Sequence, residues 1–126
     1  MARFFWICLS GAAGTGARYL LSAWITRLHG PGFPFGTLTV NVVGSFLLGA
    51  LMQVAVAAPE LSPTLRLALT TGFVGGFTTY SSFNHETLEL LATNAPLGAL
   101  NLAATLGTCL LSGILGGLAG RLLLGR

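Results

Sequence analysis

Long runs without a single charged side chain constrain this chain more than any other feature. No charge occurs between Gly30 and Pro59, and none occurs between Leu90 and Gly120. Charged residues make up 7% of the 126 residues and hydrophobic residues 53%, whereas a soluble domain carries about 25% charged residues. So few charges cannot cover the surface of a water-soluble fold. We therefore expect the chain to lie in a lipid bilayer.

Four stretches are long enough to cross a bilayer, which takes about 20 apolar residues in a helix. They run from about residue 4 to 26, 37 to 58, 64 to 92 and 99 to 124, and connectors that contain proline and glycine separate them. The sequence predicts an all-α membrane protein, one domain over residues 1–126 with four transmembrane helices. A signal peptide is the alternative for the first 27 residues, because Arg3 precedes an apolar run and small residues. Three further apolar segments favour the multi-pass interpretation.

The few charges give only a weak preference for one orientation. Four spans place both ends of the chain on one side, where Arg3, Arg66, Arg121 and Arg126 fall, while Arg27 falls on the other. The positive-inside rule then places these ends in the cytoplasm. The bias is small, so insertion in both orientations is compatible with the sequence. A net charge of +3 is also too small and too scattered for a nucleic-acid partner.

Small and polar side chains repeat along one face of two segments. The second segment has Asn41, Ser45 and Gly49 four residues apart, and the fourth has Asn101, Thr105, Cys109, Gly113 and Gly117 at the same spacing. Small residues let helices approach closely, which is our interpretation of the glycines. An amide that faces lipid costs several kcal/mol. Asn41 and Asn101 therefore either line a pore or bond to a neighbouring helix, and the spacing leaves both open.

Charged residues inside the expected spans have two interpretations each. Arg18 in the first span either extends to the membrane surface or stands as a cation at the entrance of an anion pathway. Glu86 and Glu89 lie beside His85 in the third span, where carboxylates mark ion paths or structural pairs. One of them would also be a partner for Arg18.

The segment "TTGFVGGFTTYSSF", residues 70 to 83, is unsuited to a continuous helix because it is rich in glycine, threonine and serine. Unpaired backbone at membrane depth survives only where protein buries it or where water and ions satisfy it. We therefore predict a helix break in the bundle interior, where the free carbonyls are able to bind a cation. Tyr80 and Phe83 follow on one face, and the edges of aromatic rings are electropositive. A flexible glycine kink with packing aromatics is the alternative.

Three segments in this order resemble the signatures of the CrcB/Fluc fluoride channel family. They are "GAAGTGARYLL" (11–21), "GTLTVNVVGSFLLG" (36–49) and "TTGFVGGFTTYSSF" (70–83), and with the fourth span the resemblance covers nearly the whole chain. It implies an antiparallel, dual-topology homodimer in the cell (inner) membrane, with two pores that export fluoride passively. It also implies a central structural Na⁺ held by the backbone carbonyls of Gly75 and Thr78 from both subunits.

The resemblance also implies roles for individual side chains. Asn41 matches the pore-lining asparagine, Tyr80 and Phe83 match two phenylalanines beside the pore, and Arg18 and Glu86 match an arginine and a glutamate at the vestibule or gate. Asn101, Thr105 and Cys109 are similar to a polar track on the fourth helix, and Thr79 and Ser82 add hydroxyl groups to the expected fluoride path. Tyr80 stands where phenylalanine is usual, and its hydroxyl is able to donate a hydrogen bond to fluoride.

Other classes of protein fit the sequence less well. Three carboxylates and two histidines, with no nucleophile motif or metal-ligand spacing, give no catalytic constellation, so we expect no enzyme. A small multidrug transporter is also short and four-span, but it needs an acid in its first helix, where this chain has Arg18. A purely structural subunit would explain the glycine pairs but not a broken helix followed by two aromatic residues.

Overall fold

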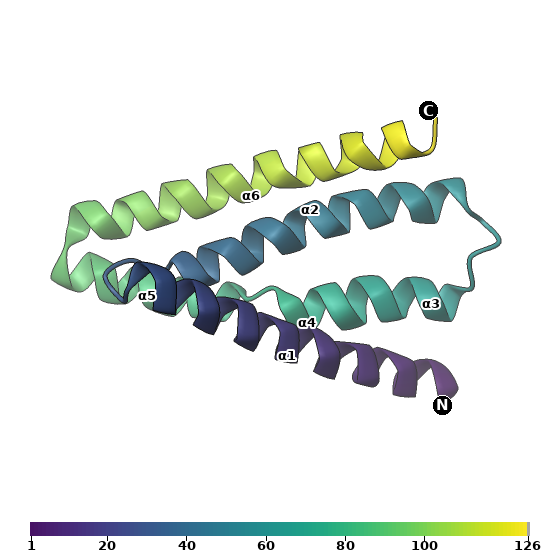
Figure 1. The fold of residues 1–126 in the computed structure, drawn as a ribbon, viewed down its shortest axis with the longest axis horizontal. Coiled ribbons are helices and arrows are strands. Elements are labelled where there is room, and N and C mark those ends of the chain that lie inside the picture. The colour runs from purple at the N-terminus through teal and green to yellow at the C-terminus, as the bar shows by residue number, and fades with distance from the viewer. Residues whose placement is uncertain (126) are drawn as a thin grey trace.

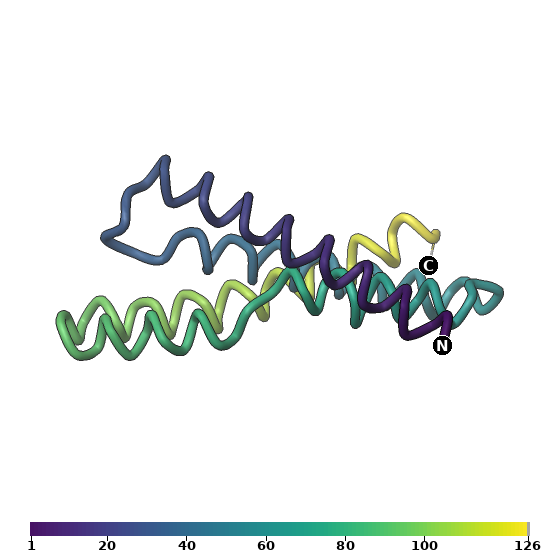
Figure 2. The backbone as a smooth tube through the Cα atoms, turned by 90° about the horizontal axis from the view of Figure 1, so that it is seen from below, coloured from purple at the N-terminus to yellow at the C-terminus, as the bar shows by residue number. Residues whose placement is uncertain are grey.

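Residues 1–125, which the computed structural model describes, form an all-helical protein without a β-strand in that range (Figure 1). The elements in chain order are α1 (Ala2–His29), α2 (Phe35–Ala57), α3 (Pro63–Leu67), the π-helix η1 (Ala68–Val74), α4 (Gly75–Phe77), α5 (Tyr80–Thr93) and α6 (Ala95–Leu123). The start of α1 and the end of α6 lie at the same end of an elongated bundle (Figure 2).

Two of these helices are long and apolar enough to cross a membrane by length and composition. They are α2, with 23 residues, and α6, with 29 residues. The 28-residue α1 does not reach the same hydropathy within the described chain, since it carries Arg3, Arg18 and Arg27 together with several hydroxyl groups. The segment from Pro63 to Thr93 is divided into pieces shorter than a span. The expectation of four spans therefore stays a prediction.

Glycines on one face of α6 allow it to pack closely along α2. Gly116 lies against the backbone of Phe46, and a methyl group added at Gly120 would lie 2.9 Å from the carbonyl oxygen of Ala50. Ser112 Oγ donates a hydrogen bond to the carbonyl oxygen of Val42 at 2.7 Å. This contact between small residues and backbone agrees with helix packing as the role of the Gly116–Gly120 pair.

A second set of glycines brings α1 against the π-helix η1 and against α4. Gly14 lies on the backbone of Phe73, and a methyl group added at Gly72 would lie 2.8 Å from the carbonyl oxygen of Ile7. The Thr15 hydroxyl donates to the carbonyl oxygen of Gly76 at 3.4 Å. These contacts place the glycine-rich segment inside the bundle, between α1 and α2.

The helix boundaries differ by a few residues from the predicted ones, and polar caps mark the starts of α3 and α6. The fourth helix is expected from about residue 99, but α6 begins at Ala95, since the Asn94 side chain accepts the Leu97 amide at 3.2 Å. Pro96 is tolerated there because the first turn of a helix has no intrahelical donors to lose. In the same way Ser62 caps α3 by accepting the Leu65 amide at 3.1 Å.

The third helical segment contains an interruption. Helix α4 ends at Phe77, Thr78 and Thr79 have extended backbone (ψ 161° and 108°), and α5 begins at Tyr80. Upstream of that point the chain forms the π-helix η1 rather than a regular α-helix. Both irregularities fall in the segment whose composition disfavours a continuous helix. The interruption lies near the middle of the bundle, where α2 passes beside it (Figure 1).

Candidate functional site

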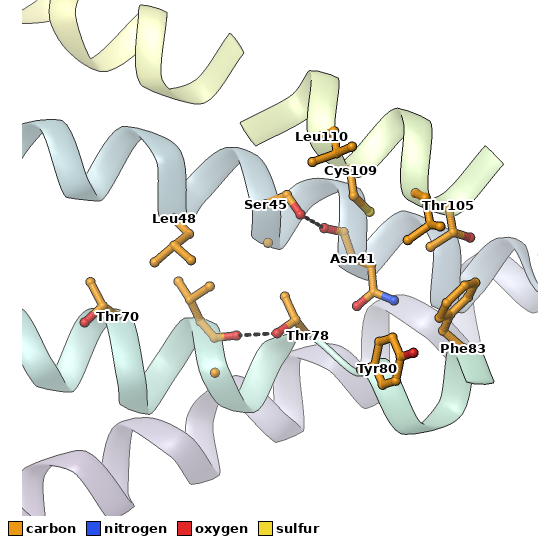
Figure 3. A pocket seen from close by; sticks show the side chains of 14 residues that line it. Asn41, Ser45, Leu48, Thr70, Thr78, Tyr80, Phe83, Thr105, Cys109 and Leu110 are labelled. Atoms are coloured by element: carbon orange, nitrogen blue, oxygen red, sulfur yellow. Dashed lines mark hydrogen bonds between the residues drawn. The ribbon is translucent and has the colours of Figure 1, made fainter. Parts of the chain in front are cut away.

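A cavity of about 410 Å³ lies beside the interruption, between α2, the η1–α5 segment and α6 (Figure 3). It brings together most of the residues that the sequence analysis singles out. They are Asn41, Gly75, Thr78, Tyr80, Phe83, Thr105 and Cys109. Ser45, one turn after Asn41 on α2, also lines it. We call this the central cavity.

Asn41 holds the extended backbone at the interruption. Its Nδ2 donates to the carbonyl oxygen of Thr79 at 3.0 Å, and its Oδ1 accepts the Thr79 amide N–H at 2.8 Å. The side chain is 9% exposed. Sequence spacing leaves open whether Asn41 lines a pore or bonds to a neighbouring helix. The structure shows that its amide is bonded to the chain and that the residue also lies at the cavity wall.

The side chain of Thr79 caps the helix that follows the interruption. Its Oγ1 accepts the Ser82 amide N–H at 3.2 Å and lies 2.9 Å from the Ser82 hydroxyl. A threonine in this position satisfies one of the amide groups that a helix start leaves unpaired. Thr79 and Ser82 do not line the central cavity. They line a second cavity on the other side of the interruption.

The two aromatic rings form an edge-to-face pair at the cavity. The centroids of Tyr80 and Phe83 are 5.7 Å apart, and their planes meet at 61°. Phe83 is 4% exposed, whereas Tyr80 is 74% exposed. Within the described chain the Tyr80 hydroxyl has no hydrogen-bond partner, so it remains available as a donor.

Asn101 does not line the central cavity, whereas Thr105 and Cys109 of the expected polar track do. It is 1% exposed, and its Nδ2 donates to Thr87 Oγ1 at 2.8 Å. Thr87 Oγ1 donates in turn to the carbonyl oxygen of Phe83 at 2.7 Å, and Thr105 Oγ1 reaches Asn101 Oδ1 at 3.5 Å. The buried Asn101 amide therefore ties α6 to α5, the helix before it in the chain, which packs directly against α6.

A second cavity of about 570 Å³ lies between α1, α2 and the start of α5. Arg18 and Glu86 both line it, yet no ion pair joins them in the described chain. Thr37 Oγ1 donates to Glu86 Oε1 at 2.7 Å, while the buried Glu86 Oε2 has no hydrogen-bond partner among residues 1–125. Arg18 is therefore not the structural partner of Glu86 that one interpretation suggested.

Sequence reasoning missed the hydroxyl groups that surround this second cavity. Thr15, Ser22 and Thr26 of α1 line it together with Arg18, and Thr37 lines it from α2. The signal was present, because positions 15, 18, 22 and 26 share one helix face at spacings of three and four. The short distance between the helices at Gly36, where an added methyl group would lie 2.7 Å from the carbonyl oxygen of Ser22, was not readable from the sequence.

The wall of the central cavity is incomplete in a single chain. Tyr80, Leu106 and Leu110 line it, yet they are 74%, 49% and 69% exposed. A neighbouring groove between α2 and α6, lined by Gly49, Gly113 and Gly117 among others, shares Ser45 and Cys109 with it. The central cavity is thus open on the side where these three residues lie.

No group of three or more histidine, cysteine or acidic side chains comes together within residues 1–125 to hold a metal ion. A cation at the central cavity would therefore depend on backbone and hydroxyl oxygens. Oxygen ligands without a carboxylate suit a weakly held monovalent cation better than Ca²⁺ or Mg²⁺, which recruit acidic side chains.

The described chain thus combines two helices long and apolar enough to cross a membrane with an interrupted third segment, and a cavity lined by several polar side chains lies at the interruption, an arrangement typical of membrane transport proteins. Residues 5–118 match the family described as "CrcB-like protein, Camphor Resistance (CrcB)", and the chain belongs to this family. The match covers the interruption, both cavities and most of α6.

Curated relatives give the same result. The chain is 56% identical over 125 residues to a protein of Sorangium cellulosum (strain So ce56), with 98% of each chain covered. It is 52% identical to a protein of Anaeromyxobacter sp. (strain K), over 89% of this chain and 90% of the relative. It is 46% identical to one of Geobacter sulfurreducens, over 91% and 94%. All three relatives are named fluoride-specific ion channel FluC, the name of a channel and not of an enzyme.

Proposed function

We propose that this protein is a fluoride-specific ion channel of the cell (inner) membrane, through which fluoride leaves the cell passively. The observation that carries this proposal is the central cavity, which hydroxyl groups and two aromatic residues line beside an interruption of the helix. The names of the relatives support fluoride as the ion, at identities of 46–56% over most of the chain.

The chemistry of the cavity suits a small, strongly hydrated anion. A pore for fluoride has to replace water with hydrogen-bond donors, and it must not bind the ion too tightly to release it. The Tyr80 hydroxyl is such a donor at the wall, and the Cys109 thiol is a weaker one. The hydroxyls of Ser45 and Thr105 also line the wall, but they would have to turn from the acceptors that they have within the chain, the Asn41 carbonyl oxygen and Asn101 Oδ1, to donate to the ion. The ring edges of Tyr80 and Phe83 are electropositive without carrying a formal charge. An anion is therefore attracted but not trapped.

Charged groups lie outside this cavity, in the second one. Arg18 at that wall would raise the local concentration of anions, as expected for a vestibule. The Glu86 carboxylate repels an anion, and the Thr37 hydroxyl, which donates to it, fixes where that negative charge lies. We therefore assign Arg18 and Glu86 to the vestibule or gate, and the central cavity to the neutral part of the path.

A second copy of the chain completes the cavity in this proposal. The exposed rim residues Tyr80, Leu106 and Leu110 leave one side of the wall without protein. The small charge bias between the two ends of the bundle is compatible with two copies inserted in opposite directions. An antiparallel homodimer would give two equivalent pores, with each wall built from both subunits.

The residues at the interruption fit a structural Na⁺ between the two subunits. The last carbonyl groups of a helix have no intrahelical partner, and α4 ends at Phe77, so backbone oxygens are available at the cavity. Gly75 and Thr78 both line it and would hold the ion, with the same residues of the second subunit. A cation bound there supplies fixed positive charge near the anion path and joins the two chains.

The membrane potential gives the direction of transport. Moving one charge across 100 mV is worth about 2.3 kcal/mol, which drives an anion outward in a cell that is negative inside. Hydrogen fluoride enters as a neutral molecule and dissociates in the cytoplasm, so the trapped anion needs an exit. A passive channel is sufficient for this task.

Efflux from liposomes tests the proposal directly. Purified protein is reconstituted into vesicles loaded with potassium fluoride or potassium chloride, and efflux is started with valinomycin and followed with ion-selective electrodes. We expect fluoride to leave rapidly and chloride to remain. Equal release of both anions, or release of neither from vesicles that demonstrably contain folded protein, would contradict the proposal.

A further inference from the structure

The backbone hydrogen bonds at the interruption are redirected to two side chains. In a continuous α-helix each amide N–H binds the carbonyl four residues earlier, so Thr79 would bind Gly75 and Ser82 would bind Thr78. In this structure the Thr79 amide binds Asn41 Oδ1 at 2.8 Å, and the Ser82 amide binds Thr79 Oγ1 at 3.2 Å. Gly75 and Thr78 thereby lose the partners that a helix would give their carbonyls.

The other carbonyl groups of this segment either accept a hydrogen bond or belong to residues that do not line the central cavity. The Val74 carbonyl accepts both the amide and the hydroxyl of Thr78, at 3.0 and 3.1 Å. The Gly76 carbonyl accepts the Thr15 hydroxyl at 3.4 Å, and neither Gly76 nor Phe77 lines the central cavity. Gly75 and Thr78 are thus the two cavity-lining residues whose carbonyls the redirection releases.

The position of Asn41 suits it to hold the extended backbone of Thr79 in place. It is attached to Thr79 at two points, through the amide N–H and through the carbonyl oxygen. Its own backbone carbonyl accepts the Ser45 hydroxyl at 2.7 Å, and the residue lies within the long helix α2. A rigid helix on one side and two hydrogen bonds on the other fix where the extended residues run.

We propose that Asn41 and the side chain of Thr79 are positioning residues for a cation: by taking the amide groups of Thr79 and Ser82, they keep the carbonyls of Gly75 and Thr78 free to bind it. This inference rests on the proposed function, because it concerns the Na⁺ site suggested there. It gives Asn41 a task besides any contact with fluoride. Without either acceptor, an amide returns to its helical carbonyl and the cation loses a ligand.

The response of purified protein to Na⁺ tests this inference without measuring transport. The unfolding temperature in detergent is followed as choline is replaced by Na⁺ at constant ionic strength, and the midpoint concentration is recorded. In Thr79→Ala the Ser82 amide is free to return to Thr78. A hydrogen bond contributes about 0.5–1.5 kcal/mol and 1.4 kcal/mol is a tenfold change, so we expect the midpoint to rise roughly two- to tenfold. Thr79→Ser keeps the acceptor and should match the wild type.

A second pair of variants examines Asn41 independently. Asn41→Leu keeps the approximate volume but removes the acceptor for the Thr79 amide, and we expect the midpoint to rise again. Ser112→Ala is its control, because it also removes a hydrogen bond to α2, the one to the carbonyl oxygen of Val42, but Ser112 does not line the central cavity. Loss of the helix cap alone lowers the unfolding temperature with and without Na⁺ and leaves the midpoint in place. The Na⁺ concentration at the midpoint therefore distinguishes an effect on the cation site from a general loss of stability.

The outcomes distinguish this inference from the proposed function. Unchanged midpoints in Thr79→Ala and Asn41→Leu, or a wild type that does not respond to Na⁺ while it releases fluoride from vesicles, would overturn the inference alone. A Na⁺ response that follows the variants, without fluoride efflux, would overturn the proposed function instead. If one variant fails to fold, the other decides. Failure of both, with folded control variants, would assign these side chains to assembly of the bundle and would also overturn the inference.

Discussion

At the scale of single residues, the two aromatic side chains beside the interruption differ in chemistry and in exposure. Phe83 is buried and offers only its ring, whereas Tyr80 is exposed at the rim and carries a hydroxyl without a partner in the described chain. A ring edge attracts an anion weakly, while a hydroxyl donates a directional hydrogen bond. Substitutions at these two positions should therefore have separable effects on fluoride flux.

Replacing Phe83 with isoleucine should slow fluoride efflux and leave assembly intact. The substitution removes the electropositive ring edge but keeps an apolar side chain. Since aromatic interactions contribute about 0.5–1.5 kcal/mol, we expect roughly a two- to tenfold loss of rate in the liposome assay. Phe73→Ile is a suitable control, because Phe73 packs against Phe77 and does not line the central cavity. Unchanged flux in Phe83→Ile would remove this ring from the mechanism.

Replacing Tyr80 with phenylalanine tests the hydroxyl alone. The ring and its edge remain, so any change in the fluoride to chloride selectivity or in the fluoride rate belongs to the hydroxyl donor. We expect a slower or less selective fluoride efflux, by roughly two- to tenfold, as for the loss of one hydrogen bond. Identical flux for both anions in wild type and variant would show that the hydroxyl does not face the ion.

Substitution of Asn101 should lower the stability of the folded protein. Asn101→Leu removes the buried hydrogen bond to Thr87 that ties α6 to α5. We expect a loss of about 1 kcal/mol, seen as a lower unfolding temperature of the purified protein. Asn94→Ala provides a comparison, since it removes an exposed helix cap in the same part of the chain. A variant that keeps its stability but loses fluoride flux would place Asn101 on the ion path.

At the scale of elements, the packing of α6 on α2 depends on the absence of side chains. Gly116 and Gly120 face the backbone of α2, so a methyl group at either position has to move a helix rather than a flexible side chain. Gly107 lies on the same helix, but a methyl group there meets nothing within 4 Å in the described structure. The three glycines are chemically alike, and only the tertiary contacts separate them.

The substitution Gly116→Ala should destabilise the protein, whereas Gly107→Ala should not. Overpacking a close contact costs typically about 1–3 kcal/mol, while alanine in an exposed helix position is slightly favourable relative to glycine. The unfolding temperature of the two purified variants in the same detergent checks this difference. Equal values would mean that α2 and α6 separate easily and that their contact is not tight in the membrane.

At the scale of the whole molecule, the distribution of charge and the incomplete cavity belong together. Both ends of the described chain lie at the same end of the bundle (Figure 2). The two ends of the bundle differ by only a few charged residues. A chain with weak orientation signals is able to insert both ways. An antiparallel partner would then cover the exposed rim of the central cavity.

Labelling of intact cells tests insertion in both directions. A single cysteine replaces the exposed Glu60, which lies in the connector between α2 and α3, in a background of Cys8→Ala and Cys109→Ser. A membrane-impermeant maleimide should label about half of this protein from outside, and all of it after the membrane is made permeable. Complete labelling or no labelling of intact cells would indicate one fixed orientation and would exclude an antiparallel homodimer.

The sequence by itself determined that the chain belongs in lipid, that it is helical and which segment contains the irregular backbone. Charge-free runs require lipid, and glycine with threonine between residues 70 and 83 disfavours a regular helix, so the irregular segment could be located without coordinates. Helix propensity and the free energy of transfer into lipid are properties of individual residues and their near neighbours. Both can therefore be judged from the sequence alone.

Only the tertiary structure decided what the polar side chains do. The spacing of Asn41 and Asn101 is alike, yet Asn41 binds an extended backbone at the cavity while Asn101 is buried in a bond to Thr87. The hydroxyls of α1 surround a second cavity because close contact at Gly36 brings α1 and α2 together. Hydrogen-bond partners depend on which helices meet and at what distance, and this packing is a long-range property that local sequence spacing does not contain.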